Sequence, residues 1–410
     1  MTAPDLLPVD EAIARIGKAI KPLGVDKIPV GEAAGRILSD ALVARRTQPP
    51  FDGSAMDGYA VRADDAATVP CTLTVVGEAA AGTSFDRPLQ AGEAVRIFTG
   101  APLPDGADAI VIQEDTERDG DRVAINEAAV AGRHIRKAGI DFREDQSFFG
   151  PGHRISAADT ALIAAMNIAE VPVIQKPRIA FFATGNELVL PGETPGPNQI
   201  VSSNNAGLAA LIRELGGEPV DLGIARDTEE SIRAHGERAR DADMLVTIGG
   251  ASVGDHDLVQ PVLKSIGLQT DFWRIAMRPG KPLMFGSLGG LPFLGLPGNP
   301  VSALVCGHLF LRAAIDALQG RPARHPATLP LTLGGDLPEN DRRQDYLRAE
   351  IRTGADGGWT AHPFSRQDSS MLSSLARSHC LIVRPSHAPA APAGSRVSAV
   401  LLKMPDLSTV

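Results

Sequence analysis

The sequence has few cysteines, and their pattern excludes two kinds of stabilising site. Cys71, Cys306 and Cys380 are far apart, odd in number and without a C-x-x-C pair. This argues against a disulfide framework and against a structural zinc site. We expect each thiol to be a small buried hydrophobe.

Basic stripes and long apolar runs are also missing. The net charge is −9, and the 40 Lys and Arg residues gather into no run, so we expect neither a nucleic-acid partner nor an anionic membrane surface. Residues 1–8 have no basic segment followed by an apolar one, and no run reaches the roughly 18 apolar residues of a membrane span. We therefore expect a reducing, cytoplasmic setting without membrane contact.

Length and composition predict several folded domains. At roughly 100 to 200 residues per domain, 410 residues predict two to four. The 42 Gly and 32 Pro approach the level of disordered chains, but 43% hydrophobic content and regular strand patterns argue for folding.

The first 176 residues combine helical patterns with a β-rich segment. Helical spacing predicts helices over 9–23 and about 31–43, and short apolar runs predict strands within 71–125. Ser156 and Asp159 resemble a capping box ahead of a helix over 157–166. We assign 1–45 with 145–176 to an N-terminal helical linker domain and 46–144 to a small β-rich domain.

After residue 176, strands and helices alternate. Strands over 178–183, 218–223, 244–248 and 291–296 are separated by helices over 204–215, 229–240 and 258–266, and a helix over 301–318 follows. This order predicts a mainly parallel, doubly wound α/β domain over 177–325, with ligands at the carboxyl ends of the strands. Strand-like runs then predict a C-terminal β domain over 326–410.

Two glycine-containing loops of the α/β segment indicate an anion-binding site. Residues 247–257 follow an apolar strand and carry Gly249, Gly250, Ser252 and Gly254, while Leu-Pro-Gly-Asn-Pro at 296–300 leads into a helix. Backbone N–H groups of such loops cradle phosphates more often than they form idle turns. Adjacent residues seldom ligate one ion together, so His256 between two aspartates does not indicate zinc, and the carboxylates suit magnesium better.

Acidic residues follow two strands of the same segment. Glu187 and Asp227 lie where the topology rule places ligands. The alternatives are helix capping by Asn186 and a helix N-terminus at Asp227, with acids in its first turn.

Other candidates are weaker by pattern alone. Asp57 falls among turn-forming glycines, Thr99 precedes a glycine at a strand end, and Asp141 follows two basic residues with which it could form a solvated ion pair. The cations at 274–281 could clamp an oxyanion or form a solvated basic edge.

Six segments together resemble one known family. Residues 54–60, 99–104, 183–188, 249–254, 278–282 and 296–302 are similar, in order and approximate spacing, to the molybdopterin molybdenumtransferases, that is the MoeA proteins and the gephyrin E domain. The resemblance covers essentially the whole chain. It implies a central MogA-like α/β domain, a C-terminal β-barrel-like domain, and a homodimer with a cleft between the α/β domain of one subunit and the β-rich domain of the other.

The resemblance also implies a reaction and its residues. Molybdenum from molybdate enters the dithiolene of adenylylated molybdopterin, AMP is released, and Mg²⁺ takes part. Other proteins of molybdenum cofactor biosynthesis are possible partners. The implied catalytic residues are Asp57, Thr99, Asp141, Glu187, Asp227 and Asp257, with Glu187, Asp227 and Asp257 as metal ligands. The implied substrate-binding residues are Gly249, Gly250, Ser252, Gly254, Arg274, Arg278, Lys281, Pro297, Gly298, Asn299, Pro300, Arg348 and Ser369.

Two departures and two alternatives stand beside this resemblance. Arg274 and Arg278 occupy positions where many relatives carry lysine, and Asp-His stands between Gly254 and Asp257.

A molybdopterin adenylyltransferase would share the glycine loop, although the attached domains argue against it. A non-catalytic, gephyrin-like scaffold is the other alternative, and the retained acids argue against that.

Overall fold

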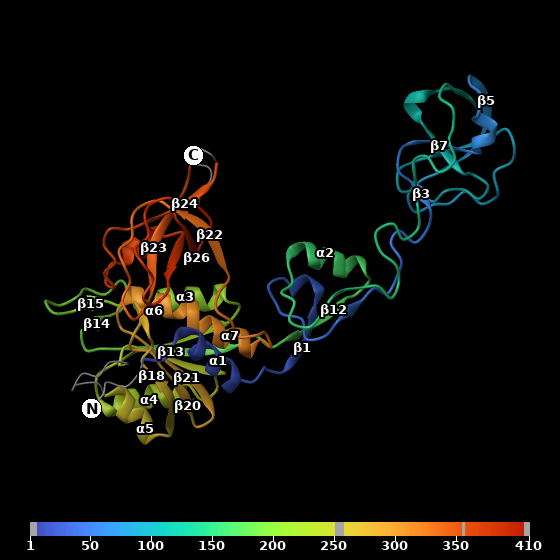
Figure 1. The fold of residues 1–410 in the computed structure, drawn as a ribbon. Coiled ribbons are helices and arrows are strands. Elements are labelled where there is room, and N and C mark those ends of the chain that lie inside the picture. Colours follow the sequence, from blue (N-terminus) through green and yellow to red (C-terminus); the bar gives the residue numbers. More distant parts are fainter. Residues whose placement is uncertain (1–5, 251–257, 355–356, 406–410) are drawn as a thin grey trace. The chain divides into compact units, whose positions relative to one another are not determined.

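A computed structural model describes residues 6–250, 258–354 and 357–405 (Figure 1). The chain divides into two compact units. Unit 1 comprises the chain up to Asp26 and from Ile174 onward, and unit 2 is Lys27–Val173. A division into two units does not test the four domains expected from the sequence, so their boundaries stay a prediction.

The centre of unit 1 is the predicted doubly wound sheet. Its six strands lie in the order β16, β13, β17, β21, β20, β18. The first four pair in parallel, whereas β20 pairs antiparallel with both β21 and β18. The bounds are β13 Arg178–Thr184, β16 Glu218–Ala225, β17 Met244–Ile248, β18 Leu268–Trp273, β20 Met284–Leu288 and β21 Leu291–Leu296.

Helices cover both faces of this sheet (Figure 1). Alternate residues of β13 enter different cores: Ile179 and Phe181 pack with one set of helices, while Ala180 and Phe182 pack with the other. This follows from the two-residue period of a strand that is buried on both faces. The first face carries α1 Val9–Ala19, α3 Asn204–Glu214, α6 Pro300–Cys306 and α7 Arg312–Leu318, and the second carries α4 Glu229–Arg238 and α5 Val259–Ser265.

The helical run Pro300–Leu318 is long and apolar enough to cross a membrane by length and composition alone, although Arg312 and Asp316 interrupt its apolar residues. However, 78% of its apolar window is buried inside the protein. A π-helical turn, η4 Gly307–Leu311, joins α6 to α7. The run is therefore the core helix of the α/β layer.

Helix α1 belongs to unit 1. Its buried residues Val9, Ala12, Ile13 and Ile16 share one core with Leu318 of α7. The spacing of its apolar residues predicts that one face is buried, but it does not predict which surface covers that face.

The C-terminal part of unit 1 is the predicted β-barrel. Its strands lie in the order β23, β24, β22, β26, β25, and a further β23–β25 pairing closes the ring. The short strand β19 Met277–Arg278 joins the barrel by pairing with β23. The bounds are β22 Thr328–Leu333, β23 Gln344–Thr353, β24 Trp359–Pro363, α8 Leu372–Arg377, β25 Cys380–Arg384 and β26 Arg396–Leu401.

Unit 2 contains the predicted β-rich segment. Six strands lie in the order β7, β4, β6, β5, β9, β8. Their bounds are β4 Gly58–Val61, β5 Cys71–Ala79, β6 Glu93–Ile97, β7 Ala109–Ile112, β8 Thr116–Asp119 and β9 Arg122–Ile125, with 3-10 turns η2 Ala63–Ala66 and η3 Gln113–Asp115. Two short strands, β3 Gly53–Ser54 and β10 Ile135–Arg136, pair beside this sheet.

The remainder of unit 2 forms a small core of its own, in which one predicted helix is wrong. Over 31–43 the chain forms only the 3-10 turn η1 Val30–Glu32 and the strand β2 Leu42–Val43. Ile37 and Leu38 instead make single β-bridges to Arg154 and Val173, so pairing with distant segments overrides the local helical pattern.

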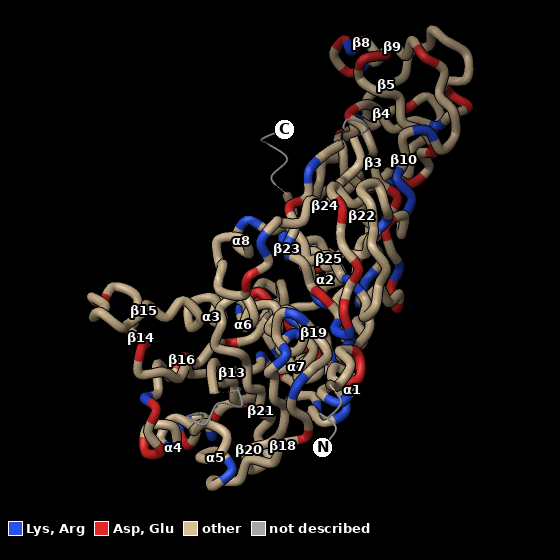
Figure 2. Tube along the Cα trace, turned by 60° about the vertical axis from the view of Figure 1, so that its left-hand side comes forward, with Lys and Arg blue, Asp and Glu red and all other residues tan. Residues whose placement is uncertain are grey.

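The capping box predicted at Ser156 is present, and α2 Ala157–Ala165 follows it. The strands near it are β1 Val25–Pro29, β11 Ser147–Phe149 and β12 Glu170–Ile174. Lys and Arg are interspersed with Asp and Glu along the described trace (Figure 2), as the absence of basic runs predicts.

Candidate functional site

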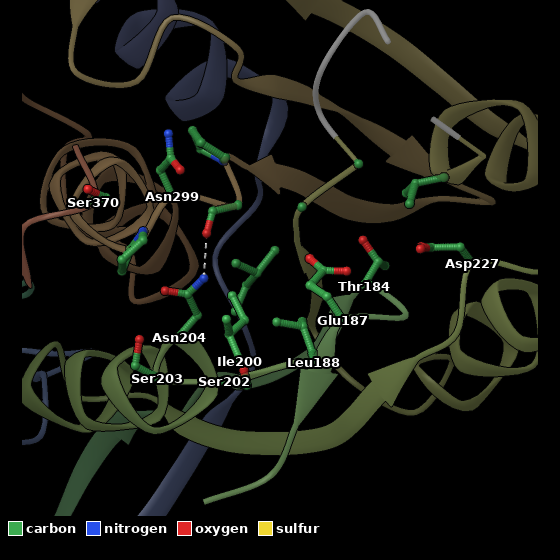
Figure 3. Close-up of a pocket in the computed structure, with 18 of the residues that line it drawn as sticks. Thr184, Glu187, Leu188, Ile200, Ser202, Ser203, Asn204, Asp227, Asn299 and Ser370 are labelled. Carbon is green, nitrogen blue, oxygen red and sulfur yellow. Dashed lines mark hydrogen bonds between the residues drawn. The ribbon is translucent and has the colours of Figure 1, made fainter. Parts of the chain in front are cut away.

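A cavity of about 800 Å³ opens at the carboxyl ends of β13, β17 and β21 (Figure 3). These strands end at Thr184, Ile248 and Leu296, and the loops that follow them form the wall. Parallel neighbours direct their carboxyl ends to one edge, so loops far apart in sequence meet there.

Eight of the predicted site residues line this cavity. They are Glu187, Asp227, Gly249, Gly250, Pro297, Gly298, Asn299 and Pro300. Ser252, Gly254 and Asp257 lie outside the described residues. Their proposed roles stay predictions.

The two acids of the cavity are positioned by the loops that carry them. The Asn186 N–H donates to Asp227 Oδ2 at 3.1 Å, and the Asp227 N–H donates to Asn186 Oδ1 at 3.2 Å. Asn186 therefore joins two loops. The helix that starts after Asp227 is capped by Thr228, whose Oγ1 accepts from the Ser231 N–H at 3.2 Å.

Glu187 folds over a glycine of its own loop. A Cβ placed on Gly185 would lie 2.5 Å from Glu187 Oε2. Both acids are exposed. A side chain at position 185 would therefore require the Glu187 carboxylate to move.

Gly249 lies close to the end of the neighbouring strand β13. Its φ is +93°, and a Cβ there would lie 2.8 Å from Thr184 Oγ1 and 3.2 Å from the Thr184 carbonyl oxygen. Its N–H donates to the Leu296 carbonyl at 3.0 Å. This bond holds the first loop against the second.

The second loop, 296–300, is anchored from two further sides. Asn204 Nδ2 donates to the Gly298 carbonyl at 2.7 Å (Figure 3), and Asn299 Nδ2 donates to Ser369 Oγ at 3.0 Å. The Val301 N–H also donates to the Ser369 carbonyl at 3.2 Å. Ser369 thus contacts the loop that carries Asn299, and its neighbour Ser370 lines the cavity.

Arg348 lies buried behind this serine segment. It is 1% exposed, its Nη1 donates to the Asp368 carbonyl at 2.6 Å, and its Nε donates to Gln367 Oε1 at 3.0 Å. Its Nη2 is buried without a hydrogen-bond partner among the described residues. Burial lowers the pKa of its guanidinium, and the arrangement holds the segment 367–370 in place.

The three predicted cations are not among the described residues that line the cavity. The guanidinium of Arg274 lies 4.5 Å from the centre of the Trp273 ring. Arg278 forms a two-pronged ion pair with the buried Asp345, with Nε–Oδ1 at 3.0 Å and Nη2–Oδ2 at 2.5 Å. Lys281 is exposed beside Pro282, which does line the cavity.

In unit 2 the structure brings Asp57 and Thr99 together. The backbone N–H and the hydroxyl of Thr99 both donate to Asp57 Oδ1, at 2.7 and 2.8 Å. These bonds, the backbone one first, hold the pKa of the Asp57 carboxyl below its usual value.

Asp141 is exposed, and its backbone N–H donates to the Gln48 carbonyl at 3.2 Å. Lys137, one of the basic residues near it in sequence, pairs instead with Asp52 at 2.7 Å.

Sequence reasoning missed one wall of the cavity. Leu188, Ile200, Val201 and Asn204 line it. The first three belong to β14 Leu188–Val189 and β15 Ile200–Val201, which are too short to show alternation. The polar run at 202–205, within which α3 begins, was the available signal for Asn204, since such runs mark helix starts.

Three family models match successive parts of the chain. The MoeA N-terminal region (domain I and II) matches residues 7–167, a probable molybdopterin binding domain matches 180–317, and the MoeA C-terminal region (domain IV) matches 330–402. The cavity lies mainly on the second of these segments.

Similar proteins extend over most of the chain. A molybdopterin molybdenumtransferase of Haemophilus influenzae is 33% identical, with 92% of this chain and 94% of that protein covered. One from a Nostoc species is 36% identical, covering 86% and 83%. A crystal structure of a molybdopterin biosynthesis MoeA protein from Pyrococcus horikosii matches with a TM-score of 0.81 at 32% identity, covering 98% of this chain and 100% of that one. With these matches and the fold described above, the chain belongs to the MoeA family of molybdopterin molybdenumtransferases.

Proposed function

We propose that this protein is a molybdopterin molybdenumtransferase that inserts molybdenum from molybdate into adenylylated molybdopterin and releases AMP. The observation that carries the proposal is the cavity itself. It gathers both glycine-containing loops and two carboxylates at the carboxyl edge of the sheet, in a chain that aligns with such transferases over most of its length.

The charges in the cavity bear on how anionic substrates would bind. Molybdate and a phosphoanhydride are both negative, so Glu187 and Asp227 alone would repel them. Two exposed carboxylates suit Mg²⁺, which is commonly held by one or two carboxylates together with substrate phosphates and water. Among the described residues, no group of three His, Cys, Asp or Glu is close enough to hold a metal by itself. When bound, Mg²⁺ would neutralise the acids and polarise phosphate oxygens.

The chain's own residues then divide into three roles. Glu187 and Asp227, with Asp257, would hold the cation, and the loops at 249–254 and 296–300 would bind phosphate through backbone N–H groups. Arg348 and Ser369 support the second loop from behind. The family resemblance also implies that Arg274, Arg278 and Lys281 contact the substrate, although none of them is among the described residues that line the cavity.

The family resemblance adds a partner and a location to the proposal. A homodimer would bring Asp57, Thr99 and Asp141 of one subunit to the cavity of the other. The protein would act in the cytoplasm together with other proteins of molybdenum cofactor biosynthesis.

The test is AMP release from adenylylated molybdopterin with Mg²⁺, measured with and without molybdate. We expect AMP release that depends on molybdate. If the protein instead accumulated the adenylate from molybdopterin and ATP, it would be an adenylyltransferase. If AMP release survived Asp57→Asn and Asp227→Asn, a non-catalytic scaffold with contaminating activity would explain the data better.

A further inference from the structure

One wall of the cavity carries exposed apolar side chains, whereas the other apolar residues of the described lining, such as Ile248, Val259 and Leu372, are buried or half-buried. Leu188 and Ile200 are paired in the parallel ladder of β14 and β15, so their side chains lie on the same face of that ladder. Both line the cavity (Figure 3), and Ile200 is 59% exposed there. Val201, which follows, is also exposed. Contiguous exposed apolar side chains at a cavity mark a binding surface more often than chance exposure.

Backbone hydrogen bonds hold this wall in place. The Ile200 N–H donates to the Glu187 carbonyl at 2.8 Å, and the Ser202 N–H donates to the Val189 carbonyl at 2.8 Å. Ser202 Oγ then donates to Asn205 Oδ1 at 2.9 Å, which ties the end of β15 to the first turn of α3. A surface fixed at both ends can orient a ligand without first being ordered.

The opposite walls have a different chemistry. Gly249, Gly250 and Gly298 bring backbone close to the cavity, and Glu187 and Asp227 supply charge. Such groups suit phosphate, oxyanion and cation, and the apolar residues on these walls, such as Leu258 and Val259, are half-buried or buried. The face of a fused heterocycle gains most from contact with aliphatic side chains, through dispersion and the removal of apolar surface from water.

We propose that Leu188 and Ile200 form the platform against which the flat pterin ring of the substrate lies. The proposal rests on the proposed function, which supplies a ligand with two fused heterocycles, a pterin and an adenine. We assign the pterin because both residues lie within the segment that matches a probable molybdopterin binding domain. The pterin would then point its side chain and phosphate toward the glycine loops.

The test compares Ile200→Ala with Ile200→Leu, using steady-state AMP release and separate titrations of a simple pterin and of AMP. In Ile200→Ala we expect the KM for adenylylated molybdopterin to rise about tenfold, because a few lost methyl groups in an apolar contact discriminate by roughly that factor. The kcat should change little, the affinity for the pterin should fall, and the affinity for AMP should stay. Ile200→Leu should restore most of the affinity.

Leu190→Ala is the matched control. Leu190 is 42% exposed next to β14 but is not among the residues lining the cavity, so its truncation should leave KM and pterin affinity unchanged. A folded Ile200→Ala variant with normal KM and normal pterin affinity would overturn the platform, and so would a loss of AMP affinity in place of pterin affinity. If the wild-type protein released no AMP, the proposed function would fail, while the two titrations would still decide where the pterin binds.

Discussion

Unit 1 and unit 2 each place carboxylates beside the ends of strands, but they do so by opposite topologies. In unit 1, Glu187 and Asp227 follow the parallel neighbours β13 and β16, whose carboxyl ends meet at one edge. In unit 2, Asp57 precedes β4 and Thr99 follows β6, and these strands are antiparallel, with Gly58 opposite Ile97. The start of one strand therefore meets the end of the other.

The difference determines what holds each acid in place. The acids of unit 1 depend on loop backbone: Glu187 lies over Gly185, and Asp227 is joined to Asn186. Among the described residues, the hydrogen bonds to the Asp57 carboxylate come from Thr99, which donates twice to one oxygen. The other oxygen, Oδ2, accepts none of these bonds. Changes to the loops should therefore displace the acids of unit 1, and removal of the Thr99 hydroxyl should weaken the hold on Asp57 in unit 2.

The largest effect is expected from neutralising the acids of unit 1. Glu187→Gln and Asp227→Asn should each lower kcat for AMP release by about 100-fold or more, the size associated with losing a group that stabilises charge in the transition state. Glu218→Gln is the control, because Glu218 begins β16 at the opposite edge of the same sheet. If both site variants kept the wild-type rate, the cavity would not be the reaction site.

The next largest effect is expected at the backbone of the cavity wall. Gly249→Ala forces a side chain into a left-handed conformation against Thr184, which costs about 1–3 kcal/mol in unfolding free energy. Urea denaturation of unit 1 measures it, and AMP release should fall as well because the two loops separate. Gly335→Ala is the control, since that glycine has open space around its missing Cβ. Equal free energies of unfolding for the two variants would contradict the close approach of Gly249 to Thr184.

A smaller effect is expected in unit 2. Thr99→Val removes the hydroxyl donor and keeps the backbone donor, so the pKa of Asp57 should rise toward the ordinary value of 3.8 without reaching it. A lowered carboxyl pKa stabilises the fold above the unfolded pKa, and this contribution is lost as pH falls through the folded pKa. Between the unfolded and the folded pKa of Asp57, the free energy of unfolding of Thr99→Val should therefore fall less on acidification than that of the wild-type protein.

Carboxyl NMR titration measures the Asp57 pKa directly. Asp52 serves as an internal control, because its pKa is lowered by Lys137 and by the Ala138 N–H, and neither bond changes in Thr99→Val. AMP release should fall about tenfold, the equivalent of one hydrogen bond to a charged group. An unchanged Asp57 titration would show that the hydroxyl contributes nothing to it.

The comparison also explains what the sequence could predict. Alternation of apolar strands and helices predicts the parallel sheet, and the topology rule then places Glu187, Asp227 and both glycine loops at one edge, where the structure has them. These are local patterns combined with one general rule. Arg348 and Ser369 could be named only from the family resemblance, because a buried arginine behind a loop leaves no periodic signal.

The two misses have different physical causes. The helix predicted over 31–43 is wrong because Ile37 and Leu38 are held in bridges to residues more than a hundred positions away. The ladder of β14 and β15 consists of two residues on each side and is stabilised by pairing across a loop rich in proline and glycine. A segment that pairs with distant partners need not follow its local pattern, and a strand of two residues is too short to show alternation, so the apolar wall of the cavity gave no signal in the sequence.

The smallest effect is expected from helix capping, and it can separate the two units. In α2 of unit 2, Ser156 Oγ accepts from the Asp159 N–H at 3.2 Å, and Asp159 Oδ2 accepts from the Ser156 N–H at 2.8 Å. In α1 of unit 1, Pro8 occupies the cap position and makes no such bond. Ser156→Ala should therefore destabilise unit 2 by about 1 kcal/mol, whereas Pro8→Ala should remove no cap from unit 1.

Hydrogen exchange, read separately over the two units, measures this difference. Faster exchange confined to Lys27–Val173 in Ser156→Ala would show that unit 2 opens on its own. Equally faster hydrogen exchange in both units would mean that the two units unfold together. The effects of Thr99 on unit 2 and of Gly249 on unit 1 would then both appear in one common free energy of unfolding.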